Sequence, residues 1–573
     1  MDPLKFFRHP EVLTQRQYEA LRAFYVDKVP GQEVARRFGY TYAAFNSLKQ
    51  RFKAGRLSFF ATHSPGPKGS RVEASVRNRV IEFRSKGLAV GEIYEVCKTL
   101  GIPISTSTID RILAQEGFPK LARRTQLKIG LTKDNTIVPD AAGTLGAEEL
   151  KGWDGECAVG GIFLFAPLIE HYGLPSIFEK LNLPSTQRIS ATNYLLSMLA
   201  LKLVGKERLS QVTDFNFDQG LGLFAGLNVL PKCTAISTYS YRFSQDQVRQ
   251  LMEKFVARQN SIRTYGSDTI NLDFHTVQHY GDESELETHW AGARSKRVKG
   301  VLTLFAQDGD SRCQLYVNAD LKRSESDDAI LEFVNFWKKI QGSFGQTLVF
   351  DARFTTYENL SELTRSGVKF ITLRRRGSNL ISKLDMIDPD NWQRLRLNVP
   401  RRKYNNPLVY DAMIPLRKYD GELRQIVMKN NGRESPAFFI TNDLEATPKE
   451  IILKYAKRWN IENVIEEAIA FFNINALSSP ILIKVHLDIL LTMIADTLYY
   501  HLAQKLRGFE SCDAQKIFRH FVNMPARIKV DTHSIHVKYP LRAHSPVLRS
   551  ANLDKSTPPL SWLGNRTVKF SWG

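Results

Sequence analysis

Cysteine is scarce in this chain of 573 residues, and it never occurs in a Cys-x-x-Cys pair or with a patterned histidine partner. Such scattered cysteines argue against a structural zinc site and against a disulfide framework. Their usage fits a reducing cytosol. The five residues are Cys97, Cys157, Cys233, Cys313 and Cys512.

Long apolar runs are also missing from the sequence. The first residues, MDPLKFFRHPEV, lack the apolar stretch of a signal peptide. The most apolar late segment, 481–503, is interrupted by Lys484, Asp488 and Asp496, so we predict a core helix there rather than a membrane span. The sequence therefore predicts a soluble, intracellular protein with no membrane partner.

The whole chain has a formal net charge of +20. Acidic residues are under-represented at its two ends. Residues 1–130 hold 23 Lys and Arg against 11 Asp and Glu, a net charge of +12. Residues 513–573 hold 10 against 3, a net charge of +7, which leaves +1 for the middle. Basic ends around a near-neutral body predict a polyanion-binding protein with a separate catalytic region. A generally basic, soluble surface is the alternative.

The length of the chain exceeds what one hydrophobic core supports, so we expect roughly three to five domains. The hydrophobic content of 43% excludes a disordered chain. Residues 1–62 and 71–130 are expected to form two small modules joined by a Pro, Gly and Ser-containing linker, His63–Ser70.

The first module contains a helix-turn-helix pattern. We predict helices over Gln32–Phe38 and Thr41–Phe52, with Gly39 in the turn and Thr41 as the N-cap. An apolar face leaves several polar residues outward, where a recognition helix would meet base edges and phosphates. These candidate DNA contacts are Asn46, Lys49, Gln50 and Arg51.

A second pattern of the same kind covers Val90–Gly117, with Gly101 in the turn and Ser105 or Thr106 as the cap. Two helices joined at a glycine are common in helical bundles, so either pattern alone is equally well explained by packing. Two of them in tandem on a strongly basic segment favour DNA binding. The outward residues of the second helix are Ser107, Thr108 and Arg111.

The periodicity changes along the rest of the chain. Residues 151–265 are predicted to be mostly helical, and strands are predicted at 269–277, 298–307, 313–319 and 346–354, with a helix at Ser326–Ile340 before the last of them. Three strands, a helix and a strand returning beside the first resemble the mixed sheet of a ribonuclease-H-like fold.

Two aspartates lie in apolar strands of this region. Asp273 follows Ile270 and Leu272, and Asp351 ends the segment LVFD. A buried carboxylate without a partner costs several kcal/mol, so such a residue is paired or binds a metal ion. A single Asp of this kind is well explained by a hydrogen bond to a loop, but two on neighbouring strands favour a shared site.

A predicted helix at Tyr455–Ala468 supplies a third acid. Tyr455, Arg458 and Glu462 follow steps of three and four residues, so they lie on one helix face. Glu462 is then a candidate metal ligand, and the planar guanidinium of Arg458 is suited to hold a phosphate with two hydrogen bonds. A solvated charged face is the competing interpretation of this helix.

These residues resemble the DDE transposases of insertion sequences, specifically the subgroup with the Tyr-Arg-Glu-Lys (YREK) signature. The segment ITNDLEATPKEIILKYAKRWNIENVIEEA is the most specific match, and the resemblance covers roughly 266–505. It implies that Asp273, Asp351 and Glu462 bind metal ions and that Tyr455 and Arg458 contact or position DNA. The signature's lysine is replaced by Ile469, so its role is absent or passes to another basic residue such as Lys457.

The spacing of the acids adds one more expectation. Asp273 and Asp351 are 78 residues apart, but Asp351 and Glu462 are 111 apart. The extra length, about 378–445, resembles the β-rich insertion of the same subgroup. There it helps to hold distorted DNA, so Trp392 is a candidate for base stacking, with core packing as the alternative. Flanking arginines are Arg394, Arg396, Arg401 and Arg402.

We therefore predict a multidomain α/β protein: helix-turn-helix modules, a helical domain at 151–265, a ribonuclease-H-like catalytic domain at 266–510 and a basic region at 511–573. Two Mg²⁺ or Mn²⁺ ions would support cleavage and strand transfer of double-stranded DNA. We expect a homodimer or larger assembly, associated with the nucleoid in a bacterial cytoplasm. The alternatives are a domesticated, non-cutting DNA-binding regulator and a nuclease of the same fold without strand transfer.

Overall fold

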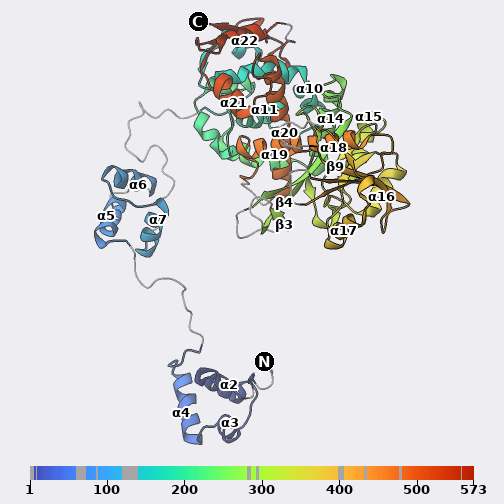
Figure 1. Cartoon of the computed structure of the whole chain (residues 1–573). Coiled ribbons are helices and arrows are strands. Elements are labelled where there is room, and N and C mark those ends of the chain that lie inside the picture. Colours follow the sequence, from blue (N-terminus) through green and yellow to red (C-terminus); the bar gives the residue numbers. More distant parts are fainter. Residues whose placement is uncertain are drawn as a thin grey trace. The chain divides into compact units, whose positions relative to one another are not determined.

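The computed structural model describes residues 6–7, 9–59, 72–85, 88, 90–118, 140–279, 286–291, 296–397, 406–430, 435–476, 481–555 and 558–573. The chain divides into two compact units, Met1–Thr136 and Ile137–Gly573 (Figure 1). Each unit has hydrophobic clusters of its own. The two are therefore described separately.

The first unit begins with three helices, α2 (Leu13–Tyr25), α3 (Gly31–Arg37) and α4 (Tyr42–Lys53). Gly39 adopts a φ of 69° between α3 and α4, which glycine does without steric cost. The Thr41 Oγ1 accepts a hydrogen bond from the Ala44 N–H at 3.2 Å and caps α4. The two helices predicted around this turn are confirmed, and α2 adds a third that packs in the same core.

The second group of helices in this unit comprises α5 (Ala74–Ser85), α6 (Val90–Thr99) and α7 (Thr106–Gln115). Ser105, one of the two predicted caps, accepts a hydrogen bond from the Thr108 N–H at 3.2 Å. The buried residues of these helices form a separate cluster. They are Val80, Ile93, Cys97, Ile109, Ile112 and Leu113.

The second unit begins with a helical region, as predicted for 151–265. Its helices cover β1 (Asp154–Cys157) and lead to the central sheet. They are α8 (Ala147–Leu150), η2 (Gly160–Phe165), α9 (Ala166–His171), α10 (Leu174–Lys180), α11 (Ala191–Leu203), η3 (Leu209–Phe215), α12 (Gln219–Phe224), α13 (Cys233–Tyr239), η4 (Ser240–Arg242) and α14 (Gln245–Ser261).

The C-terminal residues fold back onto this helical region. The strands β12 (Ala526–Val530), β13 (Ser534–Tyr539) and β14 (Thr567–Trp572) form a sheet in the order β1-β12-β13-β14. Residues 511–573, expected as a basic region by themselves, thus complete a sheet whose first strand lies near the start of the unit. The accompanying elements are α21 (Ala514–Ile517), η9 (Phe518–Val522), α22 (Ser545–Ala551) and η10 (Ser561–Leu563).

The central sheet has the order β3-β4-β2-β6-β7-β11-β10-β9-β8, and β5 pairs with β4 off this path. β2 is antiparallel to β4 but parallel to β6. The bounds of its first half are β2 (Thr269–Gln278), β3 (Thr288–Ala291), β4 (Lys296–Asp308), β5 (Gln314–Leu321), β6 (Thr347–Val349) and β7 (Phe370–Leu373). The helices between them are η6 (Arg323–Glu325), α15 (Ala329–Gln341) and α16 (Tyr357–Arg365).

The predicted order of three strands, a helix and a strand beside the first is confirmed by β2, β4, β5, α15 and β6. The last strand is shorter than predicted, because β6 ends at Val349 and Asp351 lies in the following turn. There the Phe354 N–H donates to the Asp351 carbonyl at 3.1 Å. Asp351 is thus a residue at the end of a strand and not within one.

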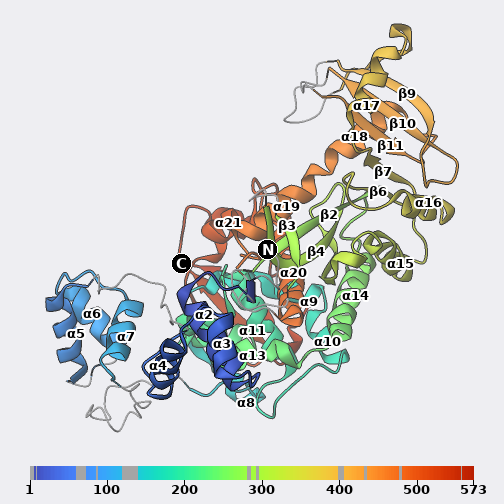
Figure 2. The same cartoon turned by 90° about the horizontal axis from the view of Figure 1, so that it is seen from below.

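The segment between the second and third acids extends the same sheet. β11 (Ala437–Thr441) pairs antiparallel with β7, and β10 (Glu422–Lys429), β9 (Leu408–Pro415) and β8 (Gln393–Arg394) follow outward. Figure 2 shows these strands at one end of the unit, beyond β6 and β7. The helical pieces before them are α17 (Ser378–Ser382), η7 (Lys383–Met386) and η8 (Pro389–Asn391).

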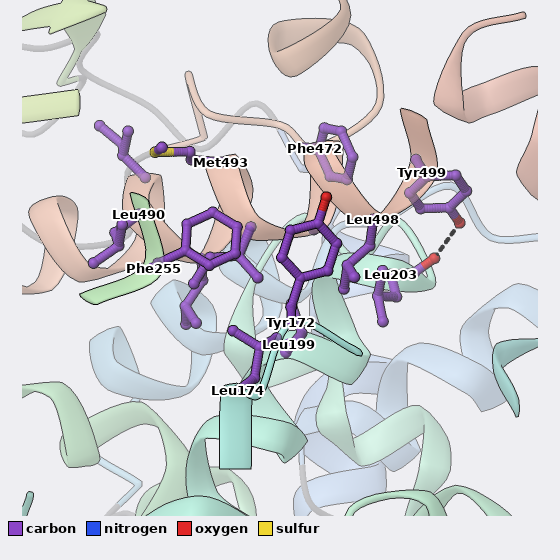
Figure 3. Packing of buried hydrophobic residues seen from close by; sticks show 14 of the residues in the cluster. Tyr172, Leu174, Leu199, Leu203, Phe255, Phe472, Leu490, Met493, Leu498 and Tyr499 are labelled. Atoms are coloured by element: carbon purple, nitrogen blue, oxygen red, sulfur yellow. Dashed lines mark hydrogen bonds between the residues drawn. The ribbon is translucent and has the colours of Figure 1, made fainter. Parts of the chain in front are cut away.

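Helix α20 (Leu482–Lys505) runs through the core of the second unit, in contact with α11, α14 and β5. Figure 3 shows its Leu490, Met493 and Leu498 among apolar side chains of the helical region, with the Tyr499 hydroxyl donating to the Leu203 carbonyl. The prediction of a core helix here is confirmed. Within the described residues no single helix has the length and hydropathy of a membrane span, although the bent pair Gly160–His171 and Leu174–Lys180 meets that test by length and composition.

Candidate active site

Asp273 and Asp351 lie side by side because of the register between β2 and β6. Asn271 pairs with Val349 in this parallel ladder. Each aspartate is two residues further along its chain, where Asp273 is still within β2 and Asp351 follows the end of β6. Both line the same cavity, and the charge of Asp351 contributes to the raised pKa of Asp273. This juxtaposition of the two acids was predicted from the sequence.

The carboxyl group of Asp273 has a raised pKa. Burial raises its pKa to about 6, the neighbouring Arg458 opposes that rise, and the charges of Glu462 and Asp351 add to it. The charges of two other carboxylates raise the pKa of a carboxyl group only when all three groups lie close together. The three predicted acids therefore belong to a single electrostatic environment.

Arg458 links two of these acids. Its Nη1 donates to Asp273 Oδ2 at 3.4 Å, and its Nη2 donates to Glu462 Oε1. Its Nε is buried and has no hydrogen-bond partner within the described part of the chain. One donor of the guanidinium is thus unused, although the side chain is only 15% exposed. Because Nε is buried, an acceptor could reach this N–H only after neighbouring groups move.

The helix that carries these residues is not continuous, which corrects the single helix predicted at Tyr455–Ala468. α18 (Pro448–Lys457) ends immediately before Arg458, and α19 (Trp459–Ala470) begins immediately after it. The Arg458 N–H donates to the Tyr455 carbonyl, and the Ile461 N–H donates to the Arg458 carbonyl, both at 3.1 Å. These three-residue steps tighten the chain locally. Arg458 and Glu462 still lie one turn apart and point together.

Tyr455 supports the site from its apolar side. Its ring packs edge-on against Phe439 at 5.3 Å between centroids, and the Arg458 guanidinium lies 5.7 Å from its centroid. Burial raises the pKa of the Tyr455 hydroxyl to about 12. A neutral phenol in this position holds Arg458 from one side. A contact between Tyr455 and DNA stays a prediction.

Lys457, the candidate replacement for the missing signature lysine, is turned toward another acid. Its Nζ donates to Asp310 Oδ1, and this hydrogen bond lowers the pKa of the Asp310 carboxyl. Ile469, at the position of the signature lysine, packs against the main core. A role for Lys457 in binding phosphate stays a prediction and would require it to exchange partners.

A cavity of about 330 Å³ lies beside the two aspartates. The stacked rings of Phe274 and Phe354, 4.2 Å apart, form an apolar part of its wall. Its charged lining brings three exposed guanidinium groups next to the acids, and none of them forms an ion pair with a carboxylate within the described ranges. They are Arg297, Arg323 and Arg353, with the exposed indole of Trp290 nearby.

Sequence analysis did not find these cavity residues. Arg353 follows Asp351 by two positions, so its proximity to the acid was a usable signal. Arg297 and Arg323 come from β4 and from η6, the short helix after β5, and nothing in their local sequence indicates that they meet. They converge only because β3, β4 and the chain after β5 surround the end of β2.

Trp392 lies in the core of the insertion, 9% exposed and in a cluster with Leu384, Val427 and Phe438. The Lys429 Nζ covers its ring at 3.6 Å from the centroid. Core packing, the alternative weighed from sequence, describes this position, and base stacking by Trp392 stays a prediction. Of the flanking arginines, Arg394 and Arg396 are exposed, whereas 401 and 402 lie outside the described residues.

The predicted recognition residues lie on α4. Gln50 and Arg51 are exposed, and Asn46 is half-buried. The half-buried Lys49 places its Nζ over the ring of Phe24, 4.3 Å from the centroid. Lys49 thus packs against its own module through an aromatic contact.

On α7, Arg111 and Ser107 are exposed, and Thr108 is half-buried. The Ser105 hydroxyl lies 3.0 Å from the hydroxyl of Ser107 and 2.9 Å from that of Thr108. Both hydroxyls are thereby engaged at the helix cap. Contacts of all seven residues of α4 and α7 with DNA stay predictions.

Metal binding by the three acids can be tested on the chemistry of the donors. Within the described ranges, no three His, Cys, Asp or Glu side chains are grouped closely enough to hold one ion, since Arg458 lies between Asp273 and Glu462. The donors themselves fit a hard divalent cation, because all three are carboxylates. The negative charges of Glu462 and Asp351 raise the pKa of Asp273, and a cation would offset this repulsion. Glu462, 40% exposed, would have to exchange Arg458 for the ion.

Comparison with known proteins gives three results. No curated protein sequence matches the chain. The cryo-EM structure of the piggyBac transposase synaptic complex with hairpin DNA aligns with a TM-score of 0.35 and 12% identity, over 64% of this chain and 79% of that chain. Residues 265–498, which contain Asp273, Asp351, Arg458 and Glu462, match the family model described as a transposase DDE domain.

Proposed function

We propose that this protein is a DNA transposase that cleaves and joins DNA at the site formed by Asp273, Asp351 and Glu462. The observation that carries this proposal is that Asp273, within β2, and Asp351, just after the neighbouring parallel strand β6, line one cavity, while Arg458 links Glu462 to Asp273. The match of 265–498 to a transposase DDE domain supports it independently.

The strand order supports a ribonuclease-H-like core. β2, β4 and β5 are joined in antiparallel ladders, and α15 returns the chain to β6, parallel to β2. The Tyr455, Arg458 and Glu462 spacing supports the YREK subgroup, whereas Ile469 departs from its signature. Assignment to that subgroup therefore depends on the three residues that are present.

Asp273, Asp351 and Glu462 would hold the divalent ions, Mg²⁺ or Mn²⁺, that enzymes of this kind use. When bound, such ions neutralise charge on the attacking and leaving oxygens of a phosphodiester. Arg458 could hold a phosphate, because its Nε–H has no partner and its Nη2 would be free if Glu462 bound an ion instead. This guanidinium would orient the scissile phosphate by two hydrogen bonds.

The three cavity arginines extend the phosphate site. Arg297, Arg323 and Arg353 line the same cavity as Asp273 and Asp351, so a DNA strand whose phosphate reaches the acids also passes these guanidinium groups. Their positive charge offsets the repulsion between a phosphodiester and the carboxylates. We assign them to binding phosphates on either side of the cleaved bond.

The helices of the first unit supply sequence-specific DNA binding in this proposal. α3–α4 and α6–α7 each have a short turn with a positive-φ glycine, Gly39 or Gly101, and a capped second helix. These features support helix-turn-helix modules. A dimer or larger assembly would bring two transposon ends together.

The decisive experiment is a cleavage and strand-transfer assay on the terminal repeats that flank the gene, with Mg²⁺ or Mn²⁺. A transposase releases 3′-hydroxyl ends and joins them to a second DNA. A non-cutting regulator binds the repeats without cleavage, and a nuclease of the same fold cleaves without joining. Binding without any cleavage in either metal would overturn the proposal.

A further inference from the structure

The sheet formed by β12, β13 and β14 has one face that carries basic residues and one serine. Its outward residues alternate with inward ones that pack in the main core, such as Ile528, Val537 and Val568. We call the exposed outward set the cationic face. It comprises Arg527, Lys529, His536, Lys538, Lys569 and Ser571.

Like charges lie directly opposite each other on this face. Arg527 pairs with Lys538 across β12 and β13, and His536 lies between Lys529 and Lys569. Directly opposed like charges destabilise a sheet. Lys538 also lies on an inner strand of the sheet, so it does not serve to block an edge.

Carboxylates of β1, on the same outward side of the sheet, neutralise part of the cationic face: exposed Glu156 lies opposite Arg527, and exposed Asp154 lies opposite Lys529. Asp154 on β1 lies 3.3 Å from Arg527 Nε and 3.2 Å from Lys529 Nζ. Asp531, in the turn before β13, accepts a hydrogen bond from His536 at 2.8 Å. Neither Lys538 nor Lys569 forms an ion pair within the described part of the chain. The unneutralised charge is therefore concentrated on β13 and β14.

We propose that the cationic face binds the phosphate backbone of double-stranded DNA, an inference that rests on the proposed function. A flat sheet with basic side chains about 6.6 Å apart along a strand and about 4.8 Å apart between strands can contact several phosphates without reading bases. Residues 513–573 carry 10 Lys and Arg against 3 Asp and Glu, and four of these ten are the Lys and Arg of the face itself.

The location of the face indicates which DNA it binds. In Figure 1, α22 and the C-terminus lie at the end of the second unit opposite to β3, which lines the cavity beside the catalytic acids. A duplex that contacts the cationic face is therefore held away from the cleaved bond. The face contributes affinity for flanking DNA and does not take part in the chemistry.

The test measures binding of a labelled duplex by the full chain over a series of salt concentrations. Lys538→Gln/Lys569→Gln removes two cations, and Lys180→Gln/Lys254→Gln removes two exposed cations from α10 and α14 as the matched control. Each lost phosphate contact reduces the salt slope by about 0.9 and weakens binding about 5-fold at 0.15 M salt. We therefore expect roughly 30-fold weaker binding for the first pair.

A second pair of variants tests the same face without removing a lysine. Ser571 lies opposite Lys538 in the β13–β14 register, so Ser571→Glu adds a negative charge to the face. Ser550→Glu adds the same charge to the exposed side of α22. Only Ser571→Glu is expected to weaken DNA binding. Thermal unfolding of each variant shows whether it remains folded.

The outcomes separate this inference from the proposed function. Selective loss of binding in Lys538→Gln/Lys569→Gln and in Ser571→Glu supports it. Equal binding by these variants and their controls overturns it, while cleavage by the unmutated chain still supports the transposase. A duplex that the unmutated chain neither binds nor cleaves overturns both. If the face variants lose binding to phosphatidylserine vesicles but bind DNA as well as the unmutated chain, the DNA-binding inference is overturned. The face would then be assigned to an anionic lipid surface.

Discussion

The Arg458 guanidinium is hydrogen-bonded to Glu462, one turn further along the chain, and to Asp273 on β2. In the proposed function, Glu462 would have to leave Arg458 in order to bind a metal ion. Its departure would free the Nη2 donor of Arg458. Phosphate binding by Arg458 and metal binding by Glu462 would then be coupled through this ion pair.

The first prediction concerns the acids. Asp273→Asn, Asp351→Asn and Glu462→Gln each replace an anionic ligand by a neutral group of the same shape, so each should abolish metal-dependent cleavage and leave DNA binding within about twofold. Gel electrophoresis of cleaved ends and a binding titration measure the two effects. Near-normal cleavage by any of the three variants would remove that residue from the metal site.

The second prediction concerns the geometry of Arg458. Arg458→Lys keeps the charge but loses the planar group that contacts Asp273, Glu462 and a phosphate together. Cleavage should fall at least about tenfold with little change in affinity for DNA. Lys457→Ala, which removes a lysine paired with Asp310, is the control expected to cleave better. Unchanged activity of Arg458→Lys would exclude the guanidinium from the site.

The third prediction is a pH dependence of stability without metal. Because the pKa of Asp273 is raised to about 6 in the folded state, its contribution is most favourable below the unfolded pKa near 3.8 and is lost as pH rises through about 6. The full loss is of the order of 3 kcal/mol. Asp273→Asn should therefore stabilise the protein more at pH 7.5 than at pH 4.5 in thermal unfolding with EDTA. An equal effect at both pH values would contradict the raised pKa.

The fourth prediction contrasts two tryptophans. Trp392→Ala empties part of a packed cluster and should cost about 3 to 5 kcal/mol of stability. Trp290→Ala removes an indole that is 57% exposed beside the acids. The free energy of unfolding should therefore change by no more than about 0.5 kcal/mol. Chemical unfolding measures both. If Trp392→Ala unfolds like the unmutated protein but cleaves poorly, base stacking is the better account of Trp392.

The fifth prediction concerns the first unit. Residues 1–136 have hydrophobic clusters of their own and carry much of the net positive charge, so this fragment should bind the terminal repeats without the second unit. Its affinity should fall steeply with salt, by about 0.9 log units per contacted phosphate for a tenfold rise in salt. Arg51→Ala and Arg111→Ala should each weaken it. A fragment that remains folded but shows no gel shift at low salt would refute the prediction.

Much of the candidate site could be proposed from the sequence because its signals are local. A carboxylate inside an apolar strand identified Asp273, and the three- and four-residue steps identified Arg458 and Glu462. The early end of β6 and the interruption at Arg458 were not predictable, since each depends on hydrogen bonds within a few residues that compete with continued strand or helix. Arg297 and Arg323 were missed because only the pairing of distant strands brings them to the acids.

The pairing of β1 with β12 has a consequence for how the protein is made. Arg527 and Asp154, which bond across this ladder, are separated by 373 residues. During synthesis, β1 cannot pair with β12 until the ribosome has released the residues of β12. Closing a loop of this length also carries an entropic cost. A product that stops before β12 keeps the first unit and the three acids but leaves the edge of β1 open. Early termination therefore yields chains that retain the helices of the first unit without a complete second unit.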